Sequence, residues 1–599
     1  MTYSVGIDMG GTFTDGYFSD GEQAKVAKVP TTHFDLTRSV MACLAEGAEA
    51  FDASPEDFLA GIDLFRLATT IGTNAVVTGT GDPVGLMVEA GAEKSLYGPS
   101  EPAPALGVFV RPEQVAGVDP EAAAEEVLAL CRDLVRQGVR QTVVSLRTQH
   151  RDAEAGLREL VRDRYPVHYL RSMPLTLGWE TADVEDDDLR TSTAVLNAYL
   201  SRPMAKLLYR TEGLLQQAGL TVPLLAARSD GTFSRMPRTT AISTYSSGPA
   251  AGLGLAAVVA RDHGDAAVVA FDMGGTTLDL GLVRNGTYEV DQGPEIRGVR
   301  VSLPVPGIVS VGLGGSSIAS RSNSGTVTVG PASVGAVPGP AAFGRGGTEP
   351  TLTDADVVAG LLADGQELPG DIVLDAASAS AALAPLADGD VAAAARLVHE
   401  AAHAKAASAI GDLLSRSGIG PAEVTLYAFG GAGGLHAGAI ADLAGIGRVR
   451  SFAAGGVFSA RGVAEAAVEQ RYEAVVESDD DPVEVIDQLV ARCRLDLESE
   501  GLPAVEAHTT VAVHHRSGRS QSEVAGIGAD PTDPVVRVEV ASNWQPPAPI
   551  QALGAANSVP SDEIVGAALI NISGAVHAIP AGWTARREGA DSLLWERSA

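Results

Sequence analysis

The chain has 599 residues, enough for three or four domains of about 150 residues each. It carries 43 Lys and Arg against 75 Asp and Glu, which gives a formal net charge of −32. A surface this acidic repels phosphate backbones and anionic lipids, so we expect neither nucleic acid nor a membrane surface as a partner. Hydrophobic residues make up 45% of the chain, which indicates a globular protein rather than a disordered one.

The cysteines and the first residues narrow the class of protein further. The three cysteines, Cys43, Cys131 and Cys493, lie far apart, so we expect no disulfide framework, no Cys-based zinc site and no iron–sulfur cluster. The opening residues, MTYSVGIDMGG, lack the basic and apolar parts of a signal peptide, and no run of about 18 apolar residues follows. We therefore expect a soluble, cytoplasmic protein.

One pattern of residues occurs twice. An apolar run at residues 3–7 leads into residues 8–15, DMGGTFTD, and a second at 267–271 leads into residues 272–279, DMGGTTLD. Each apolar run is typical of a buried strand. The shared pattern D-M-G-G-T-x-x-D predicts two structurally related halves rather than a solenoid of short repeats.

The repeated residue types suit a polyphosphate ligand. A carboxylate at a strand end can hold Mg²⁺ or one of its waters, paired glycines let backbone N–H groups approach an anion, and threonine adds a hydroxyl donor. A single Gly-Gly-Thr is more often a hairpin turn without a ligand. Two copies, each preceded by an aspartate, favour a clamp that grips a nucleotide from both sides.

Between and after the repeats, strands alternate with helices. Residues 118–138 predict an amphipathic helix and residues 141–146 a strand, a succession typical of an α/β fold. A longer helix is predicted over residues 390–415. It contains His399, Glu400 and His403 in the order H-E-x-x-H, a zinc motif when it lies on a helix. No third ligand follows at a recognisable spacing, so we expect an ordinary alanine-rich helix there.

A third glycine cluster lies at residues 426–437, LYAFGGAGGLHA, between a strand and a helix-like stretch at 437–444. Glycines at such a junction let a base or ribose lie against bare backbone. The cluster is not a dinucleotide fingerprint, because His436 stands where a further glycine is needed. Together with the two repeats, it predicts the third wall of one site.

The last part of the chain reads as β-rich. Residues 478–482, an acidic run that ends in proline, predict a domain boundary. Alternating stretches at 509–513 and 535–540 predict strands beyond it.

In their order along the chain, the two D-M-G-G-T-x-x-D repeats and the third glycine cluster resemble the actin-like ATPase superfamily and, more narrowly, the hydantoinase A / oxoprolinase family. The same resemblance is carried by residues 69–75, 190–200, 247–252, 344–351, 456–460 and 582–586. It implies an α/β fold with duplicated actin-like ATPase (ribonuclease H-like) domains and a small β-rich C-terminal domain. The implied divisions are an N-terminal half at 1–180, a second half with the phosphate and adenosine loops at 190–475, and the C-terminal domain at 483–599.

The resemblance also implies an activity and its residues. Family members use ATP to phosphorylate the carbonyl oxygen of a hydantoin, lactam or imide ring, which water then opens, together with a hydantoinase B-type partner subunit. Asp8 and Asp272 would act in catalysis by holding Mg²⁺ directly or through water. The expected phosphate ligands are Gly10, Gly11, Thr12, Gly274, Gly275, Thr276 and Thr277; the expected adenosine ligands are Gly430, Gly431 and Gly433; and the candidate substrate ligands are Asn74, Asn197 and His436.

Other functions stay open at this stage. A ketone carboxylase subunit using bicarbonate as co-substrate needs the same phosphorylation, so the loops do not separate it from a ring-opening hydrolase. A scaffold subunit that binds nucleotide without turnover is a third hypothesis. It is motivated by residues 306–316, which carry no ionisable group where the family usually has one. A small-molecule kinase of the same superfold is a further alternative.

Overall fold

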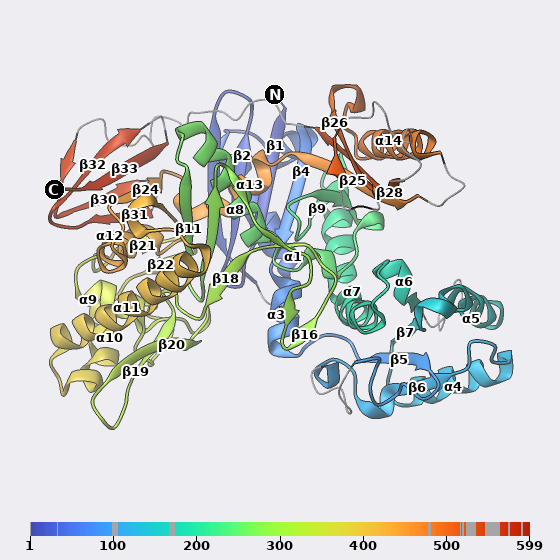
Figure 1. Cartoon of the computed structure of the whole chain (residues 1–599). Helices are drawn as coiled ribbons and strands as arrows, with labels where there is room; N and C mark the ends of the chain where they lie inside the picture. The colour runs from blue at the N-terminus through green and yellow to red at the C-terminus, as the bar shows by residue number, and fades with distance from the viewer. Residues whose placement is uncertain are drawn as a thin grey trace.

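Two mixed β-sheets form the centre of the molecule in the computed structural model (Figure 1). The structure describes residues 2–32, 34–98, 106–166, 174–476, 481–515, 517, 520–522, 535–544, 563–572, 575–588 and 591–598.

The first sheet is built on the first repeat. β1 (Tyr3–Met9) pairs antiparallel with β2 (Phe13–Ser19) and parallel with β4 (Ile62–Thr69). The apolar residues Val5, Ile7 and Met9 of β1 are buried in the core of this half. Helices α1 (Leu36–Ala50) and α7 (Asp187–Gln217) contribute to the same core. In spatial order the strands are β10 (Phe233–Arg235), β9 (Leu224–Ala227), β4 (Ile62–Thr69), β1 (Tyr3–Met9), β2 (Phe13–Ser19) and β3 (Ala24–Pro30).

The second sheet repeats this arrangement around the second repeat. β11 (Ala267–Met273) pairs antiparallel with β12 (Leu278–Arg284) and parallel with β23 (Thr425–Phe429), as β1 does with β2 and β4. Val269, Phe271 and Met273 of β11 are buried in the second core. The described strands are, in order, β13 (Thr287–Tyr288), β12 (Leu278–Arg284), β11 (Ala267–Met273), β23 (Thr425–Phe429), β24 (Arg448–Phe452), β33 (Ser592–Arg597), β32 (Trp583–Glu588) and β29 (Ile564–Val565), with β18 (Ile308–Val311) also paired to β12. The duplicated α/β architecture expected of an actin-like ATPase is thus confirmed.

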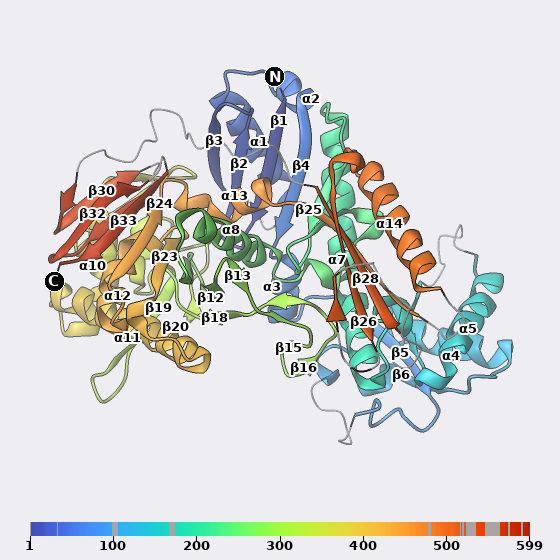
Figure 2. The same ribbon diagram turned by 45° about the horizontal axis from the view of Figure 1, so that its top comes forward.

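Two helices join the halves. α8 (Ser247–His263) and α13 (Phe458–Glu465) pack against each other; α13 also contacts β1 and β4, and α8 contacts β11 and β12. Figure 2 shows both helices between the two sheets. Because the first sheet meets α13 and the second meets α8, this pair of helices sets how the two repeats face each other.

Helices of the second half support its sheet. α11 (Val391–Ser417) begins where the Asp390 side chain accepts from Ala393 N, and it ends at Gly418 with a left-handed φ of 67°. α12 (Gly433–Ala444) begins at the glycine cluster and ends at Gly445, also left-handed. Other described helices are α2 (Pro55–Ala60), α3 (Ile71–Thr78), α6 (Gly178–Thr181), α9 (Leu352–Val358) and α10 (Ala376–Leu383).

Two smaller sheets flank the centre. One is parallel and packs with α4 (Ala124–Arg136) and α5 (Arg151–Arg164); its order is β6 (Val115–Val118), β5 (Val84–Glu89), β7 (Gln141–Ser145) and β8 (Leu175–Leu177). The other is antiparallel and packs with α14 (Pro482–Ser499); its order is β25 (Val468–Val475), β28 (Val535–Trp544), β26 (His508–His515) and β27 (Ser520–Gln521). Short two-stranded ribbons are β14 (Val290–Asp291) with β17 (Val305–Pro306), β15 (Glu295–Ile296) with β16 (Val299–Arg300), β19 (Ser317–Arg321) with β20 (Val327–Ser333), β21 (Glu367–Leu368) with β22 (Ile372–Val373), and β30 (Ala568–Ile572) with β31 (Ala575–Ile579).

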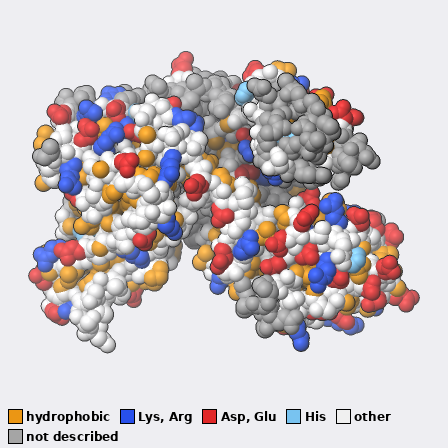
Figure 3. Space-filling view, in the orientation of Figure 1, with side chains coloured by type: hydrophobic (Ala, Val, Ile, Leu, Met, Phe, Trp, Pro, Cys, Tyr) orange, Lys and Arg blue, Asp and Glu red, His pale blue; other side chains and the backbone are white. Residues whose placement is uncertain are grey.

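The space-filling view shows an indentation between two lobes, with Asp and Glu side chains dense on the lobe that contains α4 and α5 (Figure 3). Within the described part of the chain, none of the helices combines the length and the apolar character needed to cross a membrane. All three cysteines are free and buried.

Most predicted elements are confirmed, with shifted ends. The strand predicted at 141–146 is β7, and those predicted at 509–513 and 535–540 are β26 and β28. The helix predicted from residue 118 begins instead at Ala124, because Val118 still pairs with Glu89 in the flanking sheet.

The predicted divisions of the chain remain predictions, and the sheets run across two of them. β9 and β10 follow residue 190 yet belong to the first sheet, and β32 and β33 join the second sheet through β24. At the boundary predicted for residues 478–482, residues 478–480 lie outside the described residues, and Asp481 caps α14 through Val483 N.

Candidate active site

The two repeats form equivalent turns. Asp8 is the penultimate residue of β1 and pairs with Asp15 across the β1–β2 hairpin; Asp272 and Asp279 hold the same positions in the β11–β12 hairpin. Gly10 N donates to Phe13 O at 2.9 Å, and Gly274 N donates to Thr277 O at 3.0 Å. The same hydrogen bond therefore closes both turns and leaves the intervening N–H groups outside the ladder.

The two turns face each other across a narrow gap. A Cβ atom placed on Gly275 would lie 3.3 Å from Thr12 Oγ1, and one placed on Gly11 would lie 3.6 Å from the Asn74 side chain. Residues from both halves, with Asn74 of α3, therefore border the same space. A ligand between the turns would contact both halves at once.

Four carboxylates gather around these turns with one lysine. Lys28 Nζ lies 2.6 Å from Asp15 Oδ1 and donates to Gly456 O at 2.8 Å, which leaves the Asp8, Asp272 and Asp279 carboxylates without a cationic partner among the described residues. Asp272 accepts from Ser459 Oγ at 3.3 Å, and Asp279 accepts from the Ser310 hydroxyl. The site carries more negative charge than its own side chains balance.

Burial and mutual repulsion change the acidity of the two central aspartates. Burial, with a further contribution from Asp15 and against that of Lys28, raises the pKa of Asp8 to about 7. Burial, followed by the charges of Asp279 and Asp8, raises the pKa of Asp272 to about 7. Asp272 and Asp279 line a pocket whose other residues are mostly apolar: Pro249, Leu253, Ala270, Gly281, Ile308 and Phe429.

These residues fit a divalent cation. Asp8 Oδ1 is buried without a hydrogen-bond partner among the described residues, and the carboxylates around it offer the hard oxygen donors that Mg²⁺ prefers. A cation would stabilise the ionised form of Asp8 and Asp272 and so offset the cost of burying it.

Two further glycines crowd the aspartates. A Cβ atom on Gly248, in the first turn of α8, would lie 2.6 Å from Asp8 Oδ1. Gly430, with φ of 80°, would place a Cβ atom in contact with Asp272 Oδ1 and Met273 O. A side chain at either position would displace the carboxylate. Sequence reasoning missed Gly248, although it lies in the family-like segment 247–252, because nothing local tells which aspartate it meets.

The third glycine cluster lies directly against the second turn. Gly430 N donates to Gly455 O at 2.9 Å and Ala432 N donates to Met273 O at 2.9 Å, so the backbone of residues 430–432 packs on the end of β11. No heavy atom lies within 4 Å of a Cβ placed on Gly431, which leaves its surface open. Gly433 begins α12. The structure thus brings all three predicted loops to one place.

The candidate substrate residues do not share one location. Asn74 borders the first turn. Asn197 is buried in α7, and its Oδ1 accepts from Ile242 N at 3.2 Å, so this amide oxygen already has a partner in the interior. His436 is fully buried and contacts Asp356 and His403 rather than the surface. Of the three, only Asn74 lies beside the facing turns.

Comparisons with known proteins point to the same family that the sequence motifs resemble. A family model described as "Hydantoinase/oxoprolinase" matches residues 190–472, and one described as "Hydantoinase/oxoprolinase N-terminal region" matches residues 4–155. The acetophenone carboxylase gamma subunit of Aromatoleum aromaticum is 32% identical over 558 residues, which cover 84% of this chain and 75% of that subunit. The caprolactamase subunit alpha of Pseudomonas jessenii is 31% identical over 466 residues, covering 72% of this chain and 66% of the subunit.

Among solved structures, nucleotide-free acetone carboxylase matches with a TM-score of 0.82 at 19% identity, covering 99% of this chain and 100% of that chain. At this identity the likeness shows the fold.

Proposed function

Because the chain belongs to the hydantoinase/oxoprolinase family, we propose that it is an ATP-dependent subunit that phosphorylates a carbonyl oxygen of a cyclic amide for hydrolytic ring opening. The observation that carries the proposal is the pair of facing turns, each preceded by a buried aspartate whose pKa is raised to about 7.

The chemistry follows from the weakness of an amide as an electrophile. The carbonyl oxygen attacks the γ-phosphorus of ATP and ADP leaves, which turns that oxygen into a phosphate leaving group. One water then attacks the carbon and the ring C–N bond opens, which leaves an acyl phosphate; a second water converts the acyl phosphate to the carboxylate and free phosphate. The balance is ATP, two waters and a lactam giving ADP, phosphate and an amino acid. The proposal assigns to the protein the positioning and charge stabilisation on which phosphoryl transfer depends.

In this proposal each loop has one task. The N–H groups and hydroxyls of both turns would hold the phosphates, and the open backbone at Gly431 would receive the adenosine. Asp8 and Asp272 would hold Mg²⁺ or its waters, and the ion would supply positive charge that favours phosphoryl transfer. Lys28 would keep Asp15 paired, so that the uncompensated charge stays at the centre of the site.

A second candidate is an ATP-dependent ketone carboxylase subunit with bicarbonate as co-substrate. It is favoured by the 32% identity to the acetophenone carboxylase gamma subunit, which is about equal to the 31% identity to the caprolactamase subunit alpha. Both relatives are named as subunits, so in either case we propose a hetero-oligomer, with a hydantoinase B-type chain as the partner.

The test is Mg²⁺-dependent phosphate release by the chain co-purified with its partner, assayed with cyclic amides and, separately, with ketones and bicarbonate. Asp8→Ala and Asp272→Ala should each abolish substrate-stimulated release. Asp20→Ala is the matched control, because the Asp20 carboxylate accepts from Glu22 N, Gln23 N and Gln23 Nε2 in the turn between β2 and β3, away from the facing turns.

The product separates the candidates. A ring-opened amino acid supports the hydrolase, and a carboxylated ketone formed only with bicarbonate supports the carboxylase. A phosphorylated product that persists would indicate a kinase. ATP binding without turnover of any compound would overturn the catalytic assignment and favour a scaffold subunit.

A further inference from the structure

A cluster of one carboxylate and three imidazoles lies away from the facing turns, where three helices meet. Asp356 comes from α9, His399 and His403 from α11, and His436 from the first turn of α12. Glu400, the remaining polar residue of the H-E-x-x-H motif, points elsewhere: its side chain is 64% exposed and lies 3.7 Å from Arg396. The cluster therefore draws on the two histidines of the motif but not on its glutamate.

The local structure fixes each side chain. α9 begins with a capping box in which Thr351 and Asp354 bond reciprocally, which sets the direction in which Asp356 points. His399 and His403 lie four residues apart on one face of α11, and their rings are parallel, with centroids 5.6 Å apart. Three separate helices thus converge on one small volume.

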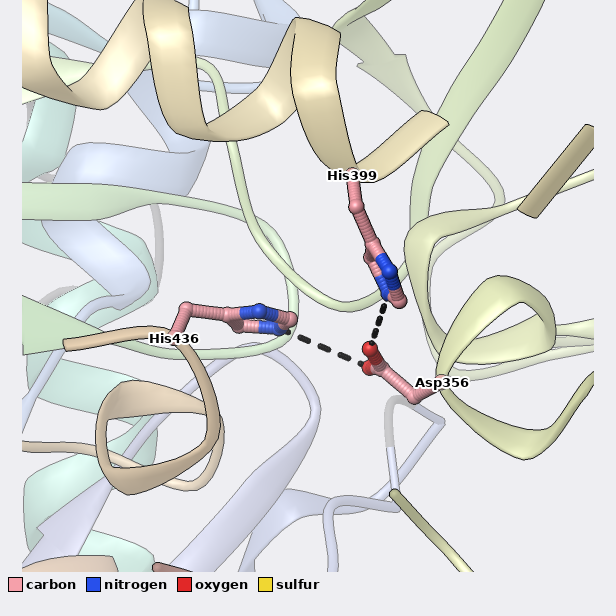
Figure 4. Close-up of side chains that lie close together, drawn as sticks. All are labelled: Asp356, His399 and His436. Atoms are coloured by element: carbon pink, nitrogen blue, oxygen red, sulfur yellow. Dashed lines mark hydrogen bonds and ion pairs between the residues drawn. The ribbon is translucent and has the colours of Figure 1, made fainter. Parts of the chain in front are cut away.

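The donor atoms have the spacing of a metal site. His399 Nε2 lies 2.8 Å from Asp356 Oδ1, and His436 Nε2 lies 3.5 Å from Asp356 Oδ2. Figure 4 shows the two rings directed at the carboxylate, one toward each oxygen. The ligand atoms of Asp356, His399 and His436 all lie within 4.8 Å of one another. Around a tetrahedral zinc ion with bonds of about 2.0–2.1 Å, ligand atoms are separated by roughly 3.4 Å.

The cluster is buried, which makes its charge balance important. The side chains of Asp356, His399 and His436 are 2%, 15% and 0% exposed. A carboxylate at this depth needs hydrogen-bonded or cationic partners beside it.

The hydrogen bond behind His436 orients the other nitrogen of its ring. His403 Nε2 lies 3.1 Å from His436 Nδ1. A neutral His403 ring can accept a hydrogen bond from that nitrogen. When His436 Nδ1–H donates to His403, the lone pair of His436 Nε2 faces the carboxylate. This Nε2 is buried and has no hydrogen-bond partner among the described residues.

We propose that Asp356, His399 and His436 bind one divalent transition-metal ion of the zinc class, and that His403 positions His436 from behind. Two neutral imidazoles and one carboxylate are ligands that zinc accepts, with a fourth position for water. A ligating histidine commonly donates its second N–H to an outer acceptor, which is the part His403 takes. The site stands independently of the proposed function.

At this place in the fold, the ion would link three helices that support the second turn and the third glycine cluster. Thr353 of α9 donates to Gly315 O at 2.9 Å, and Gly315 N in turn donates to Gly274 O at 3.1 Å in the second turn. α12 begins directly after the third glycine cluster. A metal that ties α9, α11 and α12 together would stabilise the supports of two of the three predicted nucleotide loops.

The experiment uses the full chain without a polyhistidine tag, purified without chelator. We expect about one zinc per chain by elemental analysis, a lower thermal midpoint after chelation, and recovery of that midpoint with Zn²⁺ but not with Mg²⁺. Co²⁺ added to the apoprotein should give the visible absorption bands of a nitrogen- and oxygen-ligated ion.

Variants assign the ligands. Asp356→Asn and His399→Ala should lose the stoichiometric metal and the Co²⁺ bands. His403→Ala should keep one metal per chain but weaken binding by about 10- to 100-fold. Glu400→Gln, on the same helix, should match the wild type, because its side chain points to solvent.

Two outcomes would overturn the proposal. One is a wild-type chain that binds none of Zn²⁺, Co²⁺, Mn²⁺ and Fe²⁺ stoichiometrically and whose thermal midpoint does not respond to them; the cluster would then be a hydrogen-bonded network. The other is metal retained equally by Asp356→Asn and His399→Ala, which would place the ion elsewhere. The wild-type titration decides even if a variant fails to fold.

Discussion

At the scale of single residues, close contacts around the two aspartates decide what the site tolerates. Gly430 has a φ of 80° and its Cα faces the Asp272 carboxylate, whereas a Cβ atom on the neighbouring Gly431 would meet nothing within 4 Å. Two adjacent glycines therefore differ in what a methyl group would do. Gly430 is required by its left-handed φ and by the lack of space for a Cβ atom, whereas Gly431 only keeps the surface of the loop accessible.

We expect Gly430→Ala to lower the unfolding free energy by about 1–3 kcal/mol, the cost of a left-handed non-glycine residue, and to weaken ATP binding by displacing Asp272. Thermal denaturation and calorimetric titration with Mg²⁺-ATP measure the two effects. Gly431→Ala is the control and should leave the thermal midpoint unchanged. Equal midpoints for both variants would contradict this reading of the turn.

Glu154 of α5 gives a prediction that depends on pH. It is fully buried and accepts from Leu146 N at 2.8 Å, and burial raises its pKa to about 7 from 4.5. Because the folded chain keeps this proton at a higher pH than the unfolded chain, the unfolding free energy falls as pH rises from about 4.5 to 7. The full difference corresponds to about 3 kcal/mol.

Glu154→Gln should therefore lose less thermal stability than the wild type between pH 5 and pH 8. Glu159→Gln is the matched control on the same helix, since Glu159 is exposed and pairs with Arg162. A variant whose midpoint falls as steeply as that of the wild type would show that Glu154 is not the titrating group.

At the scale of elements, a buried contact joins the first sheet to the C-terminal end of α13. Arg66 of β4 is fully buried and donates from Nη1 to the carbonyl oxygens of Val463, Ala464 and Ala466 at 2.8, 2.7 and 2.8 Å. Carbonyls at a helix end lack partners within the helix. A side chain from the first sheet thus caps the helix that separates the sheets.

We expect Arg66→Leu to destabilise the chain by about 3 kcal/mol or more, because it leaves buried carbonyl oxygens without donors. Arg416→Leu, in the exposed last turn of α11, should have a far smaller effect. Denaturant unfolding followed by circular dichroism compares the two. Similar losses would mean that the Arg66 cap contributes little.

At the scale of the whole molecule, the ligand space lies between the halves rather than within one. Thr12 and Gly275, from opposite repeats, approach closely enough for one polyphosphate to contact both. Binding energy at this position couples the halves, since neither turn alone encloses the ligand.

Mg²⁺-ATP should therefore slow hydrogen exchange in residues 9–14 and 273–278 together and raise the thermal midpoint. At a ligand concentration of 100 Kd the stabilisation is about 2.7 kcal/mol. Asp272→Ala should remove protection from both segments. Protection of only one segment would contradict a shared site.

The sequence by itself determined the local chemistry of this protein. Alternating and continuous apolar runs predicted β1, β11, β7 and β28. Such runs are informative because a strand buried on one face alternates apolar and polar residues, whereas a strand buried on both faces is apolar throughout. The repeated D-M-G-G-T-x-x-D pattern predicted two like hairpins, because an aspartate and paired glycines have the same conformational needs wherever they occur. The resemblance carried by these segments predicted the family.

Only the tertiary structure decided which distant residues meet. Local pattern does not specify that Gly248 lies against Asp8, or that Arg66 caps α13, because these contacts depend on how the sheets and helices pack. The H-E-x-x-H motif shows the same limit. Its spacing predicted two histidines on one helix face but no third ligand, and the packing of α9 and α12 against α11 supplied Asp356 and His436. Sequence spacing fixes neighbours within an element, whereas the approach of separate elements is fixed by the burial of their apolar faces.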